Sequence, residues 1–284
     1  MFNKFDRRNK NIKIFEDTMA CISRNSELSD AVEKSILGQK LYLEDIDVDG
    51  GEMNESPCRT VISKKRSFEA AGDYARQGKK VCVLNFASAT NPGGGVTSGS
   101  SAQEEALCRC STLYPCLDVK KLWDGFYQPH RNAGNPLYND DCIYTPGVVV
   151  IKSDTANPEL IPEKDWYQVD VITCAAPNLR DIPSNLMNPN AGLSAANISR
   201  DQLYELHLKR IERIFKIAIA NGAEVLILGA FGCGAFCNPP EVVAKAFKTV
   251  QNRYEKYFDV IEYAVYCREY ETTNYDAFRS IFKC

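Results

Sequence analysis

The stretch VCVLNFASATNPGGG, residues 81–95, decides the fold of this 284-residue chain. Its first seven residues are almost entirely apolar, which is typical of a strand that is buried on both faces of a sheet. The stretch ends in the consecutive glycines Gly93, Gly94 and Gly95. Because glycine lacks a Cβ atom, main chain at these positions can approach a ligand closely. The stretch therefore predicts a buried strand that leads directly into a ligand-binding loop.

Short apolar runs of the same kind recur along the chain, and helical patterns separate them. Further strands are expected at 58–63, 147–153, 169–176, 224–231 and 260–267. Helices are expected at 67–80, from Ser199 to Asn221-Gly222, and from Pro239-Pro240 onward. The second of these helices carries a capping box between Ser199 and Gln202. Such alternation favours an α/β protein with three layers, whose ligands bind beyond the carboxyl ends of the strands.

The first 57 residues lack this alternation. Residues 22–40 predict one exposed helix, and residues 41–57 form an acidic, irregular connection. We therefore expect an N-terminal helical extension over 1–57 and one large α/β domain over 58–284, in keeping with the chain length.

Composition excludes several classes of function. The net charge of −3 provides no basic field for duplex nucleic acid. No apolar run approaches the roughly 20 residues that span a bilayer. The charged N-terminus does not resemble a secretory signal, so we expect the twelve cysteines to be reduced thiols in a cytoplasmic protein. Cys108 and Cys110 are too close for a usual zinc pair, and His130 and His207 lie near neither, so no metal is expected.

A second glycine-containing loop, LGAFGCGAFCNPPE, follows the expected strand at 224–231. Its G-x-G core leads into a helix that begins with proline, a geometry that suits a phosphate group. It lacks the Gly-Lys-Ser/Thr of a P-loop and the full pattern of a dinucleotide fingerprint. Each glycine loop alone could be an ordinary turn. Two of them after two strands favour an anionic ligand at one edge of the sheet.

The sequence Gln103-Glu104-Glu105 opens a helix just after the first glycine loop. Ser101 and Glu104 have the S-x-x-E spacing of a capping box, so Glu104 could simply cap that helix. Glu105 has no local partner of this kind. A carboxyl group beside bound phosphate would have a raised pKa and could act as a general acid in glycosidic cleavage.

These motifs together are similar to those of the bacterial-type poly(ADP-ribose) glycohydrolases, which are macrodomain proteins. The resemblance rests on NFASATNPGGG followed seven residues later by QEE and ALCRCSTLY, on ITCAAPNL at 172–179, and on LGAFGCGAFCNPP at 228–240. It extends over roughly residues 58–268. It implies a three-layer α/β/α macrodomain with a mixed central sheet behind the N-terminal helical extension.

The resemblance also implies a role for each position of the two loops. Glu105 is expected to be the catalytic acid–base, and Glu104 to hold ribose hydroxyls or the scissile linkage. The implied substrate-binding residues lie around the distal ribose and the diphosphate; they are Asn91, Gly93, Gly94, Gly95, Gln103, Gly232, Cys233, Gly234, Ala235 and Phe236. Adenine would stack on an aromatic side chain near the last strand, for which Tyr266, Tyr270 and Tyr275 are candidates.

The implied reaction is hydrolysis of the ribose–ribose O-glycosidic bond of poly(ADP-ribose), which releases ADP-ribose without a metal or other cofactor. Glutamates adjacent in sequence cannot straddle a sugar as the two carboxylates of most glycosidases do. Two alternatives stay open: removal of mono-ADP-ribose from a protein side chain or another acceptor, and non-catalytic reading of ADP-ribose. The expected partners are ADP-ribose, ADP-ribosylated proteins and poly(ADP-ribose).

Overall fold

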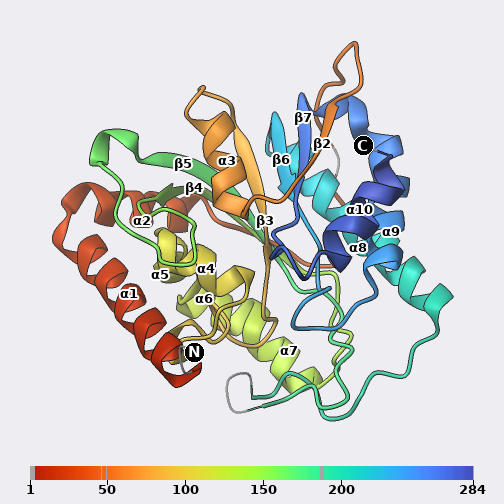
Figure 1. Cartoon of the computed structure of the whole chain (residues 1–284), viewed down its shortest axis with the longest axis horizontal. Helices are drawn as coiled ribbons and strands as arrows, with labels where there is room; N and C mark the ends of the chain where they lie inside the picture. The colour runs from red at the N-terminus through yellow and green to blue at the C-terminus, as the bar shows by residue number, and fades with distance from the viewer. Residues whose placement is uncertain (1–3, 46, 49, 186–188, 284) are drawn as a thin grey trace.

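The chain folds around one seven-stranded mixed sheet, shown in Figure 1. The computed structural model describes residues 4–45, 47–48, 50–185 and 189–283. The strands lie in the order β1-β4-β5-β3-β6-β7-β2; their bounds are β1 Lys40–Tyr42, β2 Arg59–Ser63, β3 Val81–Phe86, β4 Cys142–Val150, β5 Tyr167–Cys174, β6 Val225–Leu228 and β7 Val260–Ala264. Strands β5, β3, β6, β7 and β2 run parallel, whereas β4 and β1 run antiparallel to their neighbours.

The helices connect these strands and cover both faces of the sheet (Figure 1). Their bounds are α1 Lys4–Arg24, α2 Ser26–Gly38, α3 Ser67–Ala75, α4 Gln103–Cys110, α5 Leu113–Leu117, α6 Lys120–Leu122, α7 Gln128–Ala133, α8 Arg200–Ala220, α9 Pro240–Tyr254 and α10 Thr273–Phe282. A short 3-10 turn, η1, spans Val96–Ser98, and a π-helical segment, η2, spans Trp123–Tyr127. No helix among the described residues is both long and apolar enough to cross a bilayer.

Two large hydrophobic clusters define the layers. One joins Cys82 and Leu84 of β3 to apolar residues of α8, α9 and α10. The other joins Val81 and Val83 of the same strand to α3, α4 and α5. Alternate side chains of a strand point to opposite faces, so this division shows helices packed on both sides of the sheet. The predicted three-layer α/β fold with a mixed sheet is confirmed.

The central strands and the two long C-terminal helices occur where the sequence predicts them. Helix α8 begins after Ser199, whose Oγ accepts from the Gln202 N–H at 3.2 Å while Gln202 Oε1 accepts from the Ser199 N–H at 3.0 Å. Helix α9 begins at Pro240, as expected for proline in a first helical turn. Strand β4 begins five residues earlier than the predicted run at 147–153, and α3 ends five residues before the predicted position 80.

The prediction for residues 22–40 is wrong in detail. The chain forms two helices there, α1 and α2, which meet at Asn25. The Asn25 side chain accepts from the Leu28 N–H at 3.1 Å and so caps α2. Helix α2 is also not simply exposed, because Leu28 packs with Ile22, Val149 and Ile151 in a separate apolar cluster.

The segment 40–42 forms a strand where an irregular connection was expected. Strand β1 pairs antiparallel with β4 and adds an edge to the main sheet. Residues 1–57 thus supply α1, α2 and β1, which pack on or extend the same sheet. The domain boundary after residue 57 stays a prediction.

Candidate active site

Three neighbouring parallel strands, β5, β3 and β6, bring the predicted loops to one edge of the sheet. The first glycine loop follows β3 and the second follows β6. The loop after β5 lies between them in sequence and contacts both: the Ala87 N–H donates to the Cys174 carbonyl at 3.0 Å, and the Leu179 N–H donates to the Phe236 carbonyl at 2.9 Å. The carboxyl edge of the sheet therefore holds the candidate site together.

The first glycine loop folds so that its amides face the two glutamates. Gly93 and Gly94 have φ values of +64° and +59°, which glycine adopts without steric cost. The Gly95 N–H donates to Glu105 Oε1 at 2.9 Å, and the Gly93 N–H bonds to Glu104 and lowers its pKa. The Gly94 N–H closes the turn on the Asn91 carbonyl at 3.0 Å. The anions that this cradle of amides holds are thus the protein's own carboxyl groups.

Glu104 is held at both carboxyl oxygens. Oε1 accepts from Asn85 Nδ2 at 3.2 Å, and Oε2 accepts from the Ser88 N–H at 2.7 Å. The side chain is only 3% exposed. Burial, and next the charge of neighbouring Glu105, raise the pKa of Glu104 well above its usual value, against the smaller opposing effect of these hydrogen bonds. Glu104 is therefore a buried group with a fixed orientation.

Glu105 differs from Glu104 in having one free oxygen. Its Oε1 accepts from Gly95, whereas its Oε2 is buried and has no hydrogen-bond partner in the described part of the chain. Burial raises the pKa of Glu105 above its usual value, while the Gly95 N–H and then the charge of Arg109 lower it. Arg109 is itself buried and donates to the Ser100 carbonyl at 2.6 Å. Glu105 is thus anchored at one oxygen and able to carry a proton on the other.

Gly94 lies directly against both glutamates. A Cβ atom built on Gly94 would lie 2.6 Å from Glu105 Oε1 and 3.0 Å from Glu104 Oε2. Both separations are shorter than van der Waals contact, so no other residue fits here without displacing a carboxyl group. Gly93 is similarly enclosed, since its Cβ would lie 2.8 Å from the Tyr114 ring. These two glycines serve close packing against side chains as well as the turn.

The capping box between Ser101 and Glu104 does not form. Helix α4 begins at Gln103 with Ala102, not Ser101, as its N-cap, and no side chain caps it. The Glu104 carboxyl group turns instead toward the main chain after β3, where the Ser88 N–H binds it. The alternative that Glu104 simply caps its helix is therefore wrong.

Gln103 connects α4 to strand β3. Its Oε1 accepts from the Phe86 N–H at 2.9 Å, and its Nε2 donates to the Leu84 carbonyl at 2.8 Å and to Ser67 Oγ at 3.0 Å. These bonds use the polar atoms of the side-chain amide. In this structure Gln103 fixes the helix start that carries both glutamates.

Asn91 lies at the other end of the glycine loop and is half-buried. Its Oδ1 accepts from the guanidinium of Arg131, whose Nε also donates to the Thr90 carbonyl at 2.7 Å. The Arg131 guanidinium stacks over the ring of Trp123 at 4.6 Å. Helix α7 and segment η2 thereby hold Asn91 in place, a contact that the sequence does not reveal.

The second glycine loop is built around Asn238. Its Nδ2 donates to the Pro177 carbonyl at 2.7 Å and to the Gly232 carbonyl at 3.1 Å. Its Oδ1 accepts from Nε2 of His207, which comes from α8, at 2.9 Å. Gly232 has a φ of +76°, and a Cβ there would lie 2.5 Å from Ala176 Cβ and 2.6 Å from Asn238 Nδ2. The loop therefore requires glycine at 232 and is tied to the loop after β5.

The tip of this loop presents unused amides. The N–H groups of Gly234, Ala235 and Phe236 have no acceptor in the part of the chain that the structure describes, and Gly234 and Ala235 are exposed. A Cβ on Gly234 would meet nothing within 4 Å. The Cys233 N–H, by contrast, donates to the Ala230 carbonyl at 3.0 Å. Consecutive free amides in a turn form a concavity that suits an anion such as a diphosphate.

Phe236 turns inward from the same loop. It packs with Tyr138, Ala89 and Ala175 in a small apolar cluster, and its ring centroid lies 6.2 Å from that of Tyr138. Ala89 comes from the first loop and Ala175 from the end of β5. Phe236 therefore contacts all three loops at the edge of the sheet and fixes the second loop relative to the first.

Because of His207, the free energy of unfolding of the protein should depend on pH. Burial lowers the pKa of His207 to about 4, so the folded protein holds it neutral. Between pH 6.5 and 4 the unfolded chain binds the extra proton, and stability is lost as pH falls. Going from pH 7.5 to pH 5 should cost about 2 kcal/mol of unfolding free energy through this group. Glutamine at 207 retains the N–H donor to Asn238, so denaturant unfolding of His207→Gln should show a correspondingly smaller loss; equal losses would contradict this assignment.

The three candidate tyrosines differ in their position relative to the site. The guanidinium of Arg66 stacks over Tyr266 at 3.9 Å, and the next residue, Ser67, bonds to Gln103. Tyr270 is 80% exposed and accepts from Arg268. Tyr275 packs against the core on the side of the C-terminal helices. Of the three, Tyr266 is therefore linked to the helix that carries the glutamates, through Arg66 and its neighbour Ser67.

Asn85, Arg131, His207 and Asn238 are the supporting residues that sequence reasoning missed. Asn85 lies inside the apolar run of β3, and Asn238 lies inside the second loop. The presence of a polar residue within each motif could have indicated a supporting role. Nothing in the sequence pairs His207 or Arg131 with these loops, because both come from distant helices. No group of three or more potential metal ligands occurs among the described residues.

The chain matches the family model "Microbial-type PARG, catalytic domain" over residues 11–153, which are 143 of its 284 residues. Poly(ADP-ribose) glycohydrolase (PARG) from Thermomonospora curvata is 28% identical and superposes with a TM-score of 0.82, covering 96% of this chain and 100% of that one. The same enzyme bound to the inhibitor ADP-HPD gives 0.80. PARG from Deinococcus radiodurans in complex with ADP-ribose is 26% identical, with a TM-score of 0.72 and coverage of 89% and 96%. No curated protein sequence matches the chain.

Proposed function

The chain belongs to the microbial-type PARG catalytic-domain family, and we propose that Glu105 is the acid–base with which it hydrolyses the ribose–ribose bond of poly(ADP-ribose). The observation that carries this assignment is the difference between the two adjacent carboxyl groups. Glu104 accepts protein hydrogen bonds at both oxygens, whereas Glu105 has a buried Oε2 with no protein partner in the described residues. An acid that must give and recover a proton needs such an oxygen.

Its surroundings support the protonated state that the first step requires. Burial raises the pKa of Glu105, so that more of it carries a proton near neutral pH than an exposed glutamate would. Glu104 lies alongside with its own pKa raised, and two neighbouring carboxyl groups resist being ionised together. A substrate diphosphate would act in the same direction.

We assign the diphosphate to the second loop. The free N–H groups of Gly234, Ala235 and Phe236 form the anion-binding concavity that the first loop no longer offers, because its amides already hold the glutamates and Asn91. Gly93, Gly94 and Gly95 would line the distal ribose next to the carboxyl groups. Asn91, held by Arg131, and Phe236 would orient that ribose. Tyr266 is the tyrosine that we propose for adenine stacking.

In the reaction, Glu105 Oε2 gives its proton to the oxygen that links the two riboses. The bond between that oxygen and the anomeric carbon of the distal ribose then breaks, and the developing positive charge is stabilised by the nearby diphosphate. Water attacks the anomeric carbon, and its proton passes to the Glu105 carboxylate, which restores the acid. Glu104 keeps the ribose in position through its fixed carboxyl group. The products are ADP-ribose and a polymer that is one unit shorter.

The competing acceptor, a mono-ADP-ribosylated side chain, can be separated by experiment. Poly(ADP-ribose) and a singly ADP-ribosylated peptide should be incubated with the protein at equal concentrations of ADP-ribose termini. We expect ADP-ribose to be released from the polymer at least tenfold faster. Faster release from the peptide would identify the protein as a mono-ADP-ribosyl hydrolase. No release from either, with ADP-ribose still bound, would make it a reader of ADP-ribose.

Three further assignments belong to this proposal. We propose that the α/β/α fold is a macrodomain with its catalytic part over 58–284. We propose a cytoplasmic location, which is consistent with the free thiols of the described cysteines. The substrates in that location would be poly(ADP-ribose) and ADP-ribosylated proteins.

A further inference from the structure

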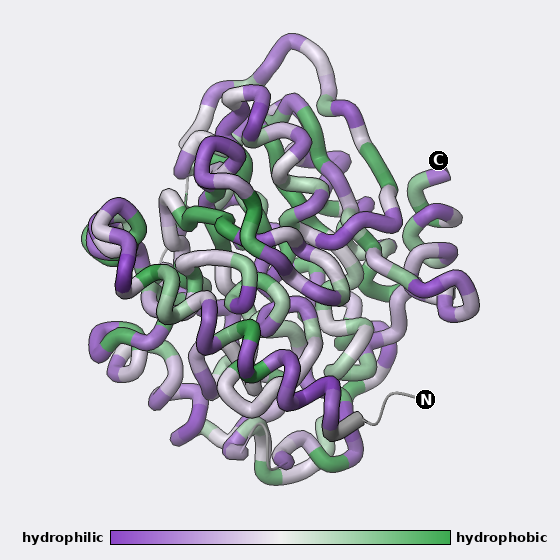
Figure 2. The backbone as a smooth tube through the Cα atoms, turned by 60° about the vertical axis from the view of Figure 1, so that its left-hand side comes forward, coloured by the Kyte–Doolittle hydropathy of each residue, from purple (hydrophilic) through white to green (hydrophobic). Residues whose placement is uncertain are grey.

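The first half of α1 is strongly basic. Residues 4–13, KFDRRNKNIK, contain five lysines and arginines and one aspartate, whereas the whole chain has a net charge of −3. Figure 2 brings this helix to the front, with hydrophilic residues prominent near the N terminus. Arg7, Arg8, Lys10 and Lys13, here called the basic segment, are all exposed. A local charge of this sign in an acidic protein suggests an anionic partner.

The start of α1 packs against the turn that leads from the first glycine loop to α4, the helix that carries the glutamates. Asn11 is buried and donates from Nδ2 to the Gly99 carbonyl at 3.0 Å. Gly99 has a φ of +75°, and a Cβ there would collide with the main chain of Arg8. Glycine at 99 is therefore needed for α1 to approach this closely. The approach places Arg8 against the loop between the three glycines and α4.

Gly99 is also close to the reacting group. It lies four residues after Gly95, whose N–H holds Glu105 Oε1 at 2.9 Å. Four residues span at most about 14 Å even when extended. Here they form a compact turn, because the Gly99 N–H donates to the Val96 carbonyl and the Ser100 N–H to the Gly95 carbonyl, both at 3.1 Å. The main chain of Arg8 therefore packs on the turn that follows Gly95, the residue whose N–H holds Glu105 Oε1.

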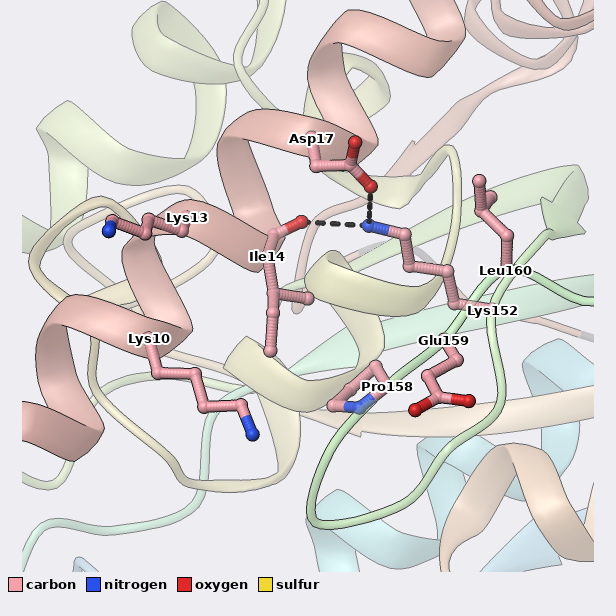
Figure 3. A pocket seen from close by; sticks show the side chains of 8 residues that line it. All are labelled: Lys10, Lys13, Ile14, Asp17, Lys152, Pro158, Glu159 and Leu160. Atoms are coloured by element: carbon pink, nitrogen blue, oxygen red, sulfur yellow. Dashed lines mark hydrogen bonds and ion pairs between the residues drawn. The ribbon is translucent and has the colours of Figure 1, made fainter.

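Arg7 and Arg8 carry charges that no carboxylate among the described residues neutralises. Neither forms an ion pair with a carboxylate in the described ranges. Lys10 and Lys13 line a cleft of about 350 Å³ between α1 and residues 158–160 (Figure 3). Lys10 Nζ donates to Asn157 Oδ1 at 2.7 Å. The one lysine there with a carboxylate partner is the buried Lys152, which pairs with Asp17 at 2.7 Å.

We propose that the basic segment binds the diphosphate of the ADP-ribose unit on the leaving side of the scissile bond. The inference rests on the proposed function, which places the distal ribose at Gly93–Gly95 and the leaving oxygen at Glu105. The unit that leaves carries its own diphosphate, and the start of α1 presents exposed arginines next to the turn at Gly99, without a carboxylate partner among the described residues. A mono-ADP-ribosylated side chain has no such second diphosphate. The basic segment would therefore make the enzyme prefer polymer over a single modification.

The test compares the double variant Arg7→Gln/Arg8→Gln with the charge-matched control Arg24→Gln/Lys34→Gln. Arg24 ends the same helix, about 24 Å from Arg8 along its axis. We expect the KM for poly(ADP-ribose) at low salt to rise about 3- to 30-fold in the first variant, since each exposed charge contact is worth up to about fivefold. Its KM should also depend less on salt. The Kd for free ADP-ribose and kcat/KM for the mono-ADP-ribosylated peptide should be unchanged, and the control should match wild type.

Direct titration of poly(ADP-ribose) in a Glu105→Gln background separates this inference from the proposed function. There the two arginine substitutions should weaken polymer binding by the same 3- to 30-fold, whether or not the wild type cleaves polymer. Polymer affinity and KM within twofold of the control would overturn the inference. So would an equal loss of affinity for free ADP-ribose, because the arginines would then belong to the site of the terminal unit.

Discussion

Glutamine in place of Glu105 should lower the kcat for ADP-ribose release from poly(ADP-ribose) by about 10²–10⁴-fold, the usual contribution of a general acid–base. The change preserves shape, and the amide oxygen of glutamine can still accept from the Gly95 N–H that holds Oε1 at 2.9 Å. What is lost is the proton on Oε2. Calorimetry should therefore give a Kd for ADP-ribose within a few fold of wild type.

Glu104→Gln is the matched control. Both oxygens of Glu104 accept protein hydrogen bonds, so an amide NH₂ at either position meets a donor from Asn85 or Ser88. Glu104→Gln should therefore disturb the position of the ribose, so that both ADP-ribose binding and turnover are weakened. Glu105→Gln, by contrast, should lower turnover alone. If Glu105→Gln turns over polymer at near wild-type rates, the assignment of the acid–base is wrong.

Valine in place of Gly94 should lower kcat/KM more than 10²-fold and weaken ADP-ribose binding at least tenfold. Its Cβ would lie 2.6 Å from Glu105 Oε1 and 3.0 Å from Glu104 Oε2, so both carboxyl groups must move. The φ of +59° adds strain, because a β-branched residue rarely adopts it. Rates and Kd values, measured after circular dichroism has verified folding, check this.

Gly234→Val provides the comparison for the second loop. Its Cβ meets no protein atom within 4 Å, so the melting temperature should stay at the wild-type value. Because the free amides of residues 234–236 are assigned to the diphosphate, we expect weaker ADP-ribose binding from this variant too. Normal binding by Gly234→Val would show that this glycine serves only the turn. Normal activity in Gly94→Val would contradict the geometry of the first loop.

The sequence predicts the architecture well because the periodicity of its central strands is unambiguous. Strand β3 alternates between two apolar clusters, Cys82 and Leu84 on one face and Val81 and Val83 on the other. Such strands read as continuous apolar runs, and the capping box at Ser199 marks a helix start with equal clarity. The secondary structure of residues 4–42 was harder to predict, because the break between helices at Asn25 and the pairing of β1 with the distant strand β4 depend on tertiary contacts.

The candidate site could be located from sequence, but its internal contacts could not. The two glycine loops and the paired glutamates are local motifs, and the sheet brings them to one edge as expected. The structure adds that the first-loop amides hold the glutamates, which leaves anion binding to residues 234–236. It also shows why Glu104 is not a helix cap. These contacts depend on how α4 packs against the end of β3. The spacing of residues along the sequence does not determine that packing.

Identification of the product released from poly(ADP-ribose) by the wild-type protein tests the central claim most directly. Reaction mixtures would be separated by chromatography and the released nucleotides identified by mass. We expect intact ADP-ribose to accumulate with time in the wild type and to be absent over the same period with Glu105→Gln. Release of AMP or phosphoribosyl-AMP would show cleavage of the diphosphate and not of the glycosidic bond. That product, or ADP-ribose formed equally by both proteins, would contradict hydrolysis of the ribose–ribose bond by Glu105.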